Sequence, residues 1–271
     1  MSGLIIKRHS QITEAVEMSD HCFIFNNKNL LLTKEDRRLP ETKEVISLLP
    51  HLTNVLEVTF DNKAVLTAHY CGDIDTTPFR SISLPSSRSV LDKDLLPMLS
   101  YAYHMYNWNK STQFCGACGN PTVLSDLEVA KNCPNCHEVN YPRISPAMIA
   151  GVVRGNELLM VKSRLYKSPY FSIVAGYLEP GETLEQCVAR EVNEETGITV
   201  KNITYFGNQP WGWSGSVMVG FTAEYQSGEI SIDESEIIEA DWFPLNKLPE
   251  RHPGKSISKD IIDHLIRSSH T

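Results

Sequence analysis

The stretch GYLEPGETLEQCVAREVNEETGI, Gly176 to Ile198, concentrates acidic side chains in a short part of the chain. Glu191, Glu194 and Glu195 fall within five residues, after a turn that carries Glu182. Like charges at neighbouring helical positions repel each other, so either water screens these carboxylates or a cation lies among them. Which of the two holds depends on the local structure of this stretch.

The same stretch carries the signals of one amphipathic helix. Thr183 and Gln186 form a capping-box pattern, and Gly197 stands where a helix favours a left-handed residue at its end. Between these ends, apolar side chains recur every four residues and form one face: Leu184, Val188 and Val192, with Cys187 beside them. The three clustered glutamates occupy positions i, i+3 and i+4, so their carboxylates gather on the other side.

Clustered carboxylate oxygens suit Mg²⁺ or Mn²⁺, and such an ion would remove the repulsion. Gly176 and the turn at Pro180-Gly181 would fold the preceding loop back against the helix. Arg190 can hold Glu182 or a metal-bound carboxylate in place. A solvated acidic face is the simpler alternative, and it explains the glutamates but not the glycines, the arginine or their spacing.

The segment resembles the Nudix box, G-x5-E-x7-R-E-U-x-E-E-x-G-U with U aliphatic. It matches at every fixed position: Gly176, Glu182, Arg190, Glu191, Val192, Glu194, Glu195, Gly197 and Ile198. The resemblance implies a Nudix hydrolase, which cleaves a nucleoside diphosphate linked to another group. It also implies an α+β fold in which a mixed sheet lies between helices as an α/β/α sandwich.

The resemblance assigns catalysis and binding of Mg²⁺ or Mn²⁺ to Glu191, Glu194 and Glu195. Ions held there would neutralise the diphosphate and lower the pKa of the attacking water. Glu195 can be a ligand, a base or both. By position the family also implies a further metal carboxylate at Glu236, although other acids of the same segment could take its place: Asp233, Glu234 and Glu239.

Four cysteines form a second motif. The pairs CGAC and CPNC place thiols at Cys115, Cys118, Cys133 and Cys136, a spacing at which four thiolates can surround one tetrahedral Zn²⁺. All four positions are cysteine, so no ligand position is left for water and the zinc should be structural. A redox role for either pair is the alternative. The other cysteines are isolated and are interpreted as simple thiols: Cys22, Cys71 and Cys187.

A zinc ribbon directly before a Nudix domain resembles the arrangement of the NADH pyrophosphatase family. The segment NYPRISPAMI, residues 140–149, also resembles that family. NQPWGWSGSVM, residues 208–218, resembles that family's S-Q-P-W-P-F-P-x-S-x-M signature. The matching residues are Gln209, Pro210, Trp211, Ser216 and Met218. The departures are Asn208, Gly212, Trp213 and Ser214, and the loss of two prolines predicts a looser loop.

This resemblance implies an aromatic pair around the nicotinamide, which maps onto Tyr141 and Tyr177. Other residues map onto substrate-lining positions: Glu128, Ile149, Gln209, Trp211, Ser216, Met218 and Ser258. Packing is the alternative role for the tyrosines, and core or interface packing for Trp211 and Trp213. The family also implies a homodimer, with the signature loop near the subunit contact.

The whole chain sets wider limits. Its 271 residues, net charge of −8 and sequence pI near 5.6 argue against a broad basic surface for nucleic acid. No apolar run reaches membrane-spanning length and no signal-peptide core is apparent, so we expect a cytoplasmic protein without a membrane partner. We predict three domains: a small α+β domain at 1–110, a zinc ribbon at 111–141 and a Nudix domain at 142–271.

Short apolar runs around turn residues predict the individual elements. In the N-terminal part, hairpins are expected around Asn26-Asn27 and Asp61-Asn62, with helices at 41–49 and 94–108. In the Nudix part, the expected strands are 147–153, 157–163, 199–206, 217–225 and 238–243, and the expected helices are 184–196 and 256–268.

Together these observations predict an NAD(H) diphosphatase, which converts NADH or NAD⁺ and water to nicotinamide mononucleotide and AMP. The same chemistry could remove an NAD cap from the 5′ end of RNA. A third alternative is a Nudix-derived sensor that binds a nucleotide without cleaving it. The intact glutamate set argues against the sensor, because a pure binder has no need of metal-activating carboxylates.

Overall fold

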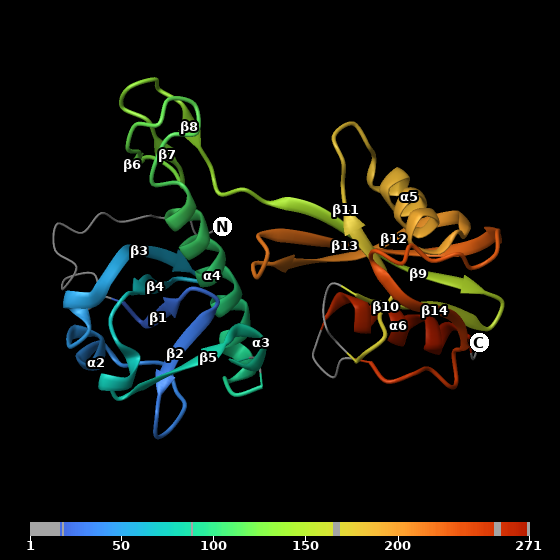
Figure 1. Cartoon of the computed structure of the whole chain (residues 1–271), viewed down its shortest axis with the longest axis horizontal. Helices are drawn as coiled ribbons and strands as arrows, with labels where there is room; N and C mark the ends of the chain where they lie inside the picture. Colours follow the sequence, from blue (N-terminus) through green and yellow to red (C-terminus); the bar gives the residue numbers. More distant parts are fainter. Residues whose placement is uncertain (1–16, 18, 88, 165–168, 252–255, 270–271) are drawn as a thin grey trace. The chain divides into compact units, whose positions relative to one another are not determined.

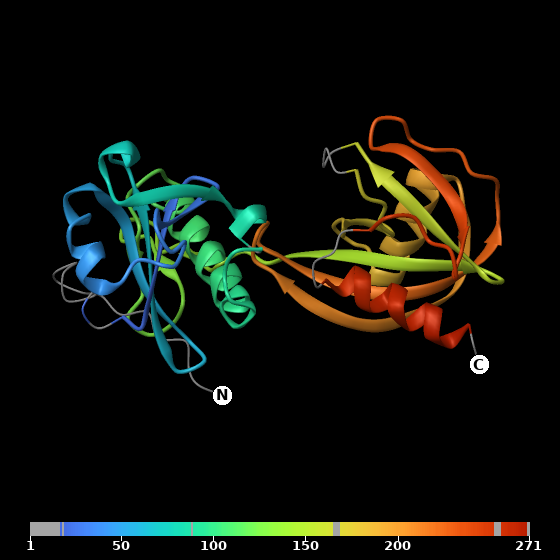
Figure 2. The same ribbon diagram turned by 90° about the horizontal axis from the view of Figure 1, so that it is seen from below.

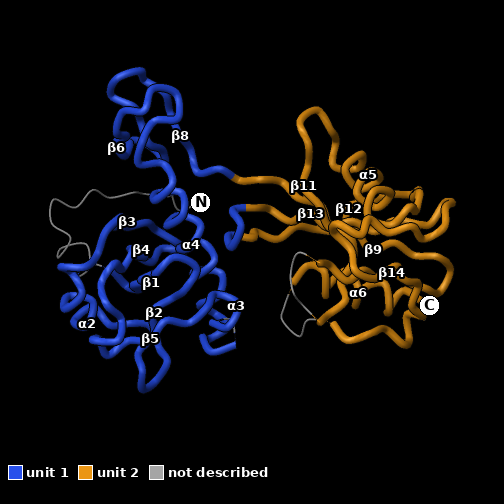
Figure 3. The backbone as a smooth tube through the Cα atoms, in the orientation of Figure 1, with its two compact units in different colours: residues 1–143, 212–215 blue, residues 144–211, 216–271 orange. Residues whose placement is uncertain are grey.

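The computed structural model describes residues 17, 19–87, 89–164, 169–251 and 256–269 (Figure 1; Figure 2 from below). Two compact units divide the chain (Figure 3). Unit 1 comprises residues 1–143 and 212–215, and unit 2 comprises residues 144–211 and 216–271. The three-domain division remains a prediction, since the ribbon and the N-terminal segment fall in the same unit.

Unit 1 is built on a five-stranded sheet in the order β3-β4-β1-β2-β5. The strands are β1 (His21–Asn26), β2 (Asn29–Thr33), β3 (Leu52–Phe60), β4 (Lys63–Tyr70) and β5 (Phe79–Ser83). Both predicted hairpins are present, and each turn contains asparagine with positive φ, at Asn27 and Asn62. Strand β1 pairs with β4 in parallel, whereas the other neighbours are antiparallel.

Alternation along β1 divides the core of unit 1. Phe23 and Phe25 pack with helix α4 (Leu96–Ser111), whereas Cys22 and Ile24 pack on the other face with helix α2 (Thr42–Ile46). The predicted helices thus exist, with shifted ends. A 3-10 turn precedes α4, and Pro97 stands in the first turn of α4, where its missing N–H costs no helical hydrogen bond. Short elements complete the unit: α3 (Leu84–Ser87) and the 3-10 turns at 49–51, 74–76 and 93–95.

The zinc ribbon is a three-stranded antiparallel sheet in unit 1, in the order β6-β7-β8. Its strands are two residues each: β6 (Val123–Leu124), β7 (Lys131–Asn132) and β8 (Val139–Asn140). Lys131 is only 3% exposed, and its ammonium donates to the carbonyls of Asn109 and Thr112 at the end of α4. These bonds attach the ribbon to the helix before it, and burial lowers the pKa of Lys131 to about 8.

Unit 2 contains a mixed sheet in the order β12-β13-β9-β10-β14, with β11 also paired to β9. Strands β9 and β13 are parallel and the remaining pairs are antiparallel. The strands are β9 (Ser145–Arg154), β10 (Glu157–Ser163), β11 (Val174–Tyr177), β12 (Thr199–Trp211), β13 (Ser216–Ser227) and β14 (Ile237–Pro244). Figure 2 shows helices α5 (Leu184–Thr196) and α6 (Ile257–Ser268) on opposite sides of this sheet.

Strand alternation explains the layers of unit 2. Met148 of β9 and Leu159 of β10 belong to the cluster under α5, whereas Ile149 and Leu158 belong to the cluster under α6. A strand buried on both faces reads as a continuous apolar run, as β9 and β10 do. The predicted mixed α+β fold, with its sheet between helices, is confirmed. No helix among the described residues has the length and apolar character to cross a membrane.

Candidate active site

Helix α5 forms as its end signals predict. The Thr183 hydroxyl accepts from the Gln186 N–H, and the Gln186 side chain accepts from the Thr183 N–H, which completes the capping box. Gly197 ends the helix in the left-handed conformation at φ 73°, and its N–H donates to the Asn193 carbonyl. Cys187, Val188 and Val192 face the sheet. Glu194 is exposed, whereas Glu191 lies against Gly176 of β11 and Glu195 is buried.

Arg190 organises the loop that precedes α5. Its guanidinium lies 2.6 Å from one oxygen of Glu182 and 2.9 Å from Glu194, and it also donates to the Tyr177 carbonyl at 3.0 Å. This arrangement lowers the pKa of Glu182 to about 2, chiefly through the hydrogen bond from Arg190. The predicted role of Arg190 as a clamp on Glu182 is thus what the geometry provides.

Gly176 gives Glu191 room beside the sheet. A Cβ atom at position 176 would lie 1.9 Å from the carboxyl carbon of Glu191, so any side chain there would displace that carboxylate. Gly176 is held in register opposite Met148 by the pairing of β11 with β9. The first glycine of the motif therefore serves a close approach between strand and helix side chain, not a special backbone angle.

Five carboxylates line a hollow of about 330 Å³ at the acidic face of α5: Glu191, Glu194, Glu195, Asp233 and Glu236. Glu195 is 7% exposed, and among the described residues no hydrogen bond or ion pair reaches its carboxylate. Burial, followed by the charges of Glu191, Glu236 and Asp233, raises its pKa to about 8. Burial also raises the pKa of Glu191.

These carboxylates fit a divalent cation. A buried carboxylate without a partner is costly, and a bound cation compensates both its burial and the repulsion from its neighbours. The donors are all oxygen, which is the ligand type that Mg²⁺ and Mn²⁺ prefer. Glu191, Glu194, Glu195 and Glu236, the four predicted ligands, do face one hollow. The sequence named Asp233 only as a substitute for Glu236, whereas the structure places both there.

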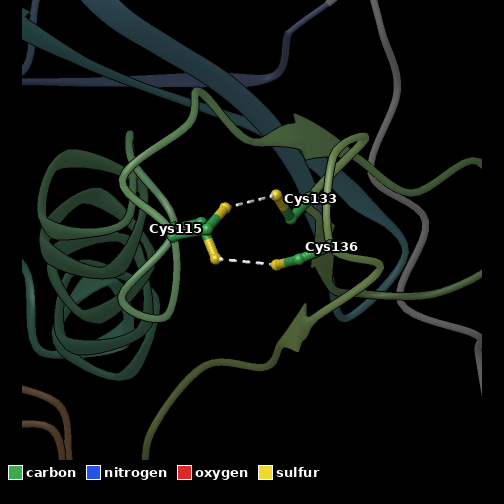
Figure 4. Close-up of side chains that lie close together, drawn as sticks. Cys115, Cys133 and Cys136 are labelled. Carbon is green, nitrogen blue, oxygen red and sulfur yellow. Dashed lines mark hydrogen bonds between the residues drawn. The ribbon is translucent and has the colours of Figure 1, made fainter.

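The four ribbon cysteines are gathered more tightly. All four sulfur atoms lie within 4.8 Å of one another, and Figure 4 shows the labelled side chains of Cys115, Cys133 and Cys136 pointing inward from two loops. The closest sulfur pairs are Cys115–Cys136 at 3.5 Å and Cys118–Cys133 at 3.4 Å. Hydrogen bonds, chiefly from Asn120, lower the pKa of Cys118 to about 6. This closed set of free thiols fits a structural Zn²⁺.

The two cysteine loops share one local design. The Gly119 N–H donates to the Cys115 carbonyl at 2.9 Å, and the His137 N–H donates to the Cys133 carbonyl at 3.0 Å. Both donors lie in the left-handed region, at φ 75° for Gly119 and 63° for His137. Each turn therefore brings its pair of thiols to the same side of the loop.

Several predicted substrate residues share one face of the unit 2 sheet. Tyr177 pairs with Ala147, Ala147 pairs with Met218, and Met218 pairs with Gln209, so their side chains form one cross-strand row. Trp211 pairs with Ser216 in the next row on that face, and Ile149 lies two residues beyond Ala147. The buried Ile149 packs against α6, so this face is opposite to the one that α5 covers.

Side-chain contacts connect this row to its surroundings. The half-exposed Tyr177 makes a 3.1 Å hydrogen bond between its hydroxyl and that of the buried Ser216. Gln209 accepts from the Ile257 N–H at 2.9 Å, so its side chain caps the start of α6. Ser258, in the first turn of α6, lies 3.4 Å from the Ser172 hydroxyl. Unit 2 thus brings together seven of the predicted substrate residues: Ile149, Tyr177, Gln209, Trp211, Ser216, Met218 and Ser258.

The other two predicted substrate residues belong to unit 1. The exposed Tyr141 donates its hydroxyl to Glu128 at 3.0 Å, and this hydrogen bond raises the pKa of Tyr141. Because Tyr141 and Tyr177 fall in different units, their pairing around one nicotinamide stays a prediction.

The departures from the family signature have contacts of their own in unit 1. The Gly212 N–H donates to the Ser100 hydroxyl at 3.0 Å, and Trp213 packs near Tyr103 in the core cluster of α4. A Cβ atom at position 212 would lie 2.0 Å from the Ser100 carbonyl oxygen, so proline would not fit there. Gly212, which replaces one of the prolines, is therefore held by a hydrogen bond, and Trp213, which replaces phenylalanine, is packed in the core. The predicted loosening of the loop stays a prediction.

Comparison with known proteins agrees with this geometry. The NUDIX domain matches residues 144–265, and the NADH pyrophosphatase zinc ribbon domain matches residues 110–141. A protein of Pseudomonas aeruginosa named NAD-capped RNA hydrolase NudC is 44% identical over 179 residues, which cover 66% of this chain and 64% of that relative. A protein of the same name from Pseudomonas putida is 39% identical over 213 residues, or 73% of this chain and 77% of the relative.

Among solved structures, a NUDIX hydrolase from Nitrosomonas europaea aligns over 59% of this chain and 93% of its own, at 23% identity and a TM-score of 0.47. That score is too low to support a conclusion, so the assignment depends on the sequence matches. Both domains match in order, and a relative of 39% identity is covered over 77% of its length. The chain therefore belongs to the Nudix family, in the group that carries the NADH pyrophosphatase zinc ribbon.

Proposed function

We propose that the protein hydrolyses the diphosphate bond of NADH or NAD⁺ to nicotinamide mononucleotide and AMP, with Mg²⁺ or Mn²⁺. The observation that carries the proposal is the hollow of five carboxylates on the Nudix helix, with the buried Glu195 at its wall. Membership of the Nudix family supports it, as do relatives named for hydrolysis of NAD-capped RNA.

Each part of the site has a proposed role. The divalent cation would supply positive charge for the diphosphate and a lower pKa for the attacking water. Glu191, Glu194, Glu195 and Glu236 would hold it, and Arg190 keeps the loop and helix in register through Glu182. Without metal, burial and the neighbouring carboxylates raise the pKa of Glu195 to about 8. A bound cation would lower this pKa again, so Glu195 would act in its ionised form, as a ligand, as a base or as both.

Recognition of the nicotinamide is assigned to the sheet face opposite α5. The exposed ring of Tyr177 would stack on the nicotinamide, together with Tyr141. The row through Met218 and Gln209, with Ser216, Trp211, Ile149 and Ser258 around it, would line the rest of the substrate. Glu128 would act through its hydrogen bond to Tyr141.

The test is a product assay on the purified full chain. NADH incubated with Mg²⁺ or Mn²⁺ should give AMP and reduced nicotinamide mononucleotide in equal amounts, and chelation of the divalent cation should stop the reaction. ADP-ribose and ADP-glucose in parallel measure the preference for nicotinamide. A preparation that binds Mn²⁺ but releases no AMP from NADH would contradict the proposal.

Removal of an NAD cap from RNA is the second candidate, favoured by the relatives named NAD-capped RNA hydrolase. The bond broken is the same, so the two activities differ only in what is attached to the adenosine. A short RNA with a 5′ NAD cap should then be converted to a 5′-monophosphate RNA. The ratio of kcat/KM for this RNA to that for NADH decides which substrate the site prefers.

The remaining proposals concern metal content, assembly and location. One structural Zn²⁺ would occupy the ribbon thiols. A homodimer is proposed from the family resemblance, and light scattering of the eluted protein at several concentrations tests it. All seven cysteines are free thiols, which supports a reducing compartment such as the cytoplasm.

A further inference from the structure

We infer that Asp233 is a fifth metal-facing carboxylate, which supplies a ligand to the divalent cation from the loop opposite α5. This inference rests on the proposed function of the hollow as a divalent-metal site. Asp233 lies outside the Nudix box and three residues before Glu236, the acid that the family pattern selects. It lines the same hollow as the three helix glutamates.

The side chain of Asp233 is oriented before any metal binds. Its Oδ1 accepts two hydrogen bonds from Ser235, from the N–H at 2.8 Å and from the hydroxyl at 2.7 Å. Both bonds use the same oxygen, and among the described residues none is made to Oδ2. One oxygen thus anchors the carboxylate while the other is available to a cation.

The loop that carries Asp233 is itself fixed to α5 and β10. The Asp233 N–H donates to the Glu195 carbonyl of α5 at 3.3 Å. Within the loop, the Ile237 N–H donates to the Asp233 carbonyl at 2.8 Å. On the other side, the Arg164 N–H donates to the Glu236 carbonyl at 2.7 Å, and its side chain donates to the Glu234 carbonyl. A carboxylate on a fixed backbone loses little entropy when it binds a metal.

Glu195 gives independent support for a cation beside Asp233. Glu195 is 7% exposed as a residue and lines the hollow, and its carboxylate has no partner among the described residues. The charge of Asp233 is among those that act on it. All five lining residues are acidic. Arg190 pairs with Glu191 at 3.0 Å and with Glu194 at 2.9 Å, but among the described residues no cationic side chain pairs with Glu195, Asp233 or Glu236. A divalent ion between α5 and the loop would compensate the negative charge of both sets of carboxylates.

The neighbouring acids do not share this placement. Glu234 and Glu239 carry the same charge in the same segment, but neither lines the hollow. Glu239 pairs with Lys162 in the β10–β14 ladder instead. The substitution Glu234→Gln therefore offers a matched control. It removes one charge from the same exposed loop but changes no residue that lines the hollow.

The test compares Mn²⁺ binding by Asp233→Asn and Glu234→Gln in the full chain, by titration calorimetry or by the electron paramagnetic resonance of free Mn²⁺. Asparagine retains an oxygen that can accept both Ser235 bonds, so the loop should keep its structure. We expect Asp233→Asn to raise the Mn²⁺ dissociation constant about tenfold. Glu234→Gln should change it by less than about twofold, which is the general electrostatic effect of one exposed charge.

The melting temperatures of both variants without metal show whether they are folded. Equal shifts in Mn²⁺ affinity for the two variants, or no shift in folded Asp233→Asn, would overturn the inference. Binding is measured without NADH, so the outcome is separate from the proposed function. A wild-type protein that binds Mn²⁺ through Asp233 but does not cleave NADH would contradict the proposed function and still support this inference.

Discussion

The ribbon thiols and the acidic hollow are two predicted metal sites of opposite construction. The four sulfur atoms already lie within 4.8 Å of one another, on loops with matching backbone geometry. The five carboxylates line an open hollow of about 330 Å³, where burial, followed by the charges of neighbouring carboxylates, raises the pKa of Glu195. One site is complete in protein ligands, and the other keeps room for water and substrate.

This difference predicts how each metal relates to folding. A closed thiolate set around zinc contributes folding free energy, so losing the metal should cost structure. An open carboxylate site destabilises the metal-free fold, because unpaired charge is held close together and partly buried. Removal of a ligand cysteine should therefore destabilise the ribbon, whereas removal of a ligand carboxylate should stabilise the metal-free hollow.

The largest expected effect is at the ribbon. Wild-type protein should contain one tightly held Zn²⁺ per chain, and Cys118→Ser should lose it. Structural zinc binding contributes about 10–16 kcal/mol in small zinc domains, so this variant should lose solubility or fold before it loses catalysis specifically. Cys71→Ser, at an exposed thiol outside the ribbon, is the control and should keep zinc and solubility. Zinc-free wild-type protein purified without chelator would disprove a structural metal.

The next effect is catalytic. Glu195→Gln removes the charge of the buried carboxylate and nearly preserves its shape, so the fold should remain. Hydrolysis of NADH should fall by about a hundredfold or more, as expected for loss of a principal acid–base or electrostatic group. Glu185→Gln, on the first turn of the same helix and outside the hollow, should retain turnover within about twofold. Near-normal turnover of Glu195→Gln at saturating Mg²⁺ would mean that the acidic face is only solvated.

A smaller effect is expected at the face proposed to recognise nicotinamide. Tyr177→Ala should lower kcat/KM for NADH by about ten- to a hundredfold, because stacking contributes roughly 1–3 kcal/mol per ring. ADP-ribose, which lacks nicotinamide, should lose much less. Tyr141→Ala should behave alike if both rings contact the same base.

Two variants separate stacking from packing. Tyr177→Phe keeps the ring but loses the hydrogen bond to Ser216, so it should retain most of the NADH activity. Tyr205→Ala removes a similarly exposed ring from the same sheet and should affect neither substrate selectively. Equal losses of Tyr177→Ala on NADH and ADP-ribose would assign the ring to packing.

The elements that the sequence predicted well are those whose signals are local. The capping box at Thr183, the left-handed end at Gly197 and the cysteine knuckles each depend on a few neighbouring residues, and each forms in the structure. The carboxylates of α5 also follow from helical spacing alone. Helical periodicity therefore predicted the three lining carboxylates that come from one element, Glu191, Glu194 and Glu195.

The features that the sequence left open depend on contacts between distant segments. Strand β11 is only four residues long, and it exists because it pairs with β9. The sequence predicted Glu236 and gave Asp233 only as a substitute, whereas both line the hollow in the folded loop, which is bonded to α5 and to the residue after β10. The hydrogen bond from the Gly212 N–H to Ser100 could not be predicted either, because Ser100 is far away in sequence.

The smallest expected effect concerns the stability of the metal-free hollow. Burial raises the pKa of Glu195 from 4.5 to about 8, whereas in the unfolded chain the carboxyl keeps its ordinary value. Between these values the folded protein binds more protons than the unfolded chain, so its stability should fall as the pH rises through this window. Glutamine carries no charge, and Glu195→Gln should therefore be the more stable protein at alkaline pH.

In metal-free buffer, we expect Glu195→Gln to melt about 2–6 °C above wild type at pH 8.5, with the difference nearly gone at pH 5, where Glu195 is protonated in the folded state. Glu185→Gln should show no such pH dependence, because Glu185 is exposed. Saturating Mg²⁺ should stabilise wild type more than Glu195→Gln, since the ion compensates the charge that the variant lacks. A melting difference that is the same at both pH values would show that burial of this charge is not what strains the site, and the contrast with the ribbon would lose its electrostatic basis.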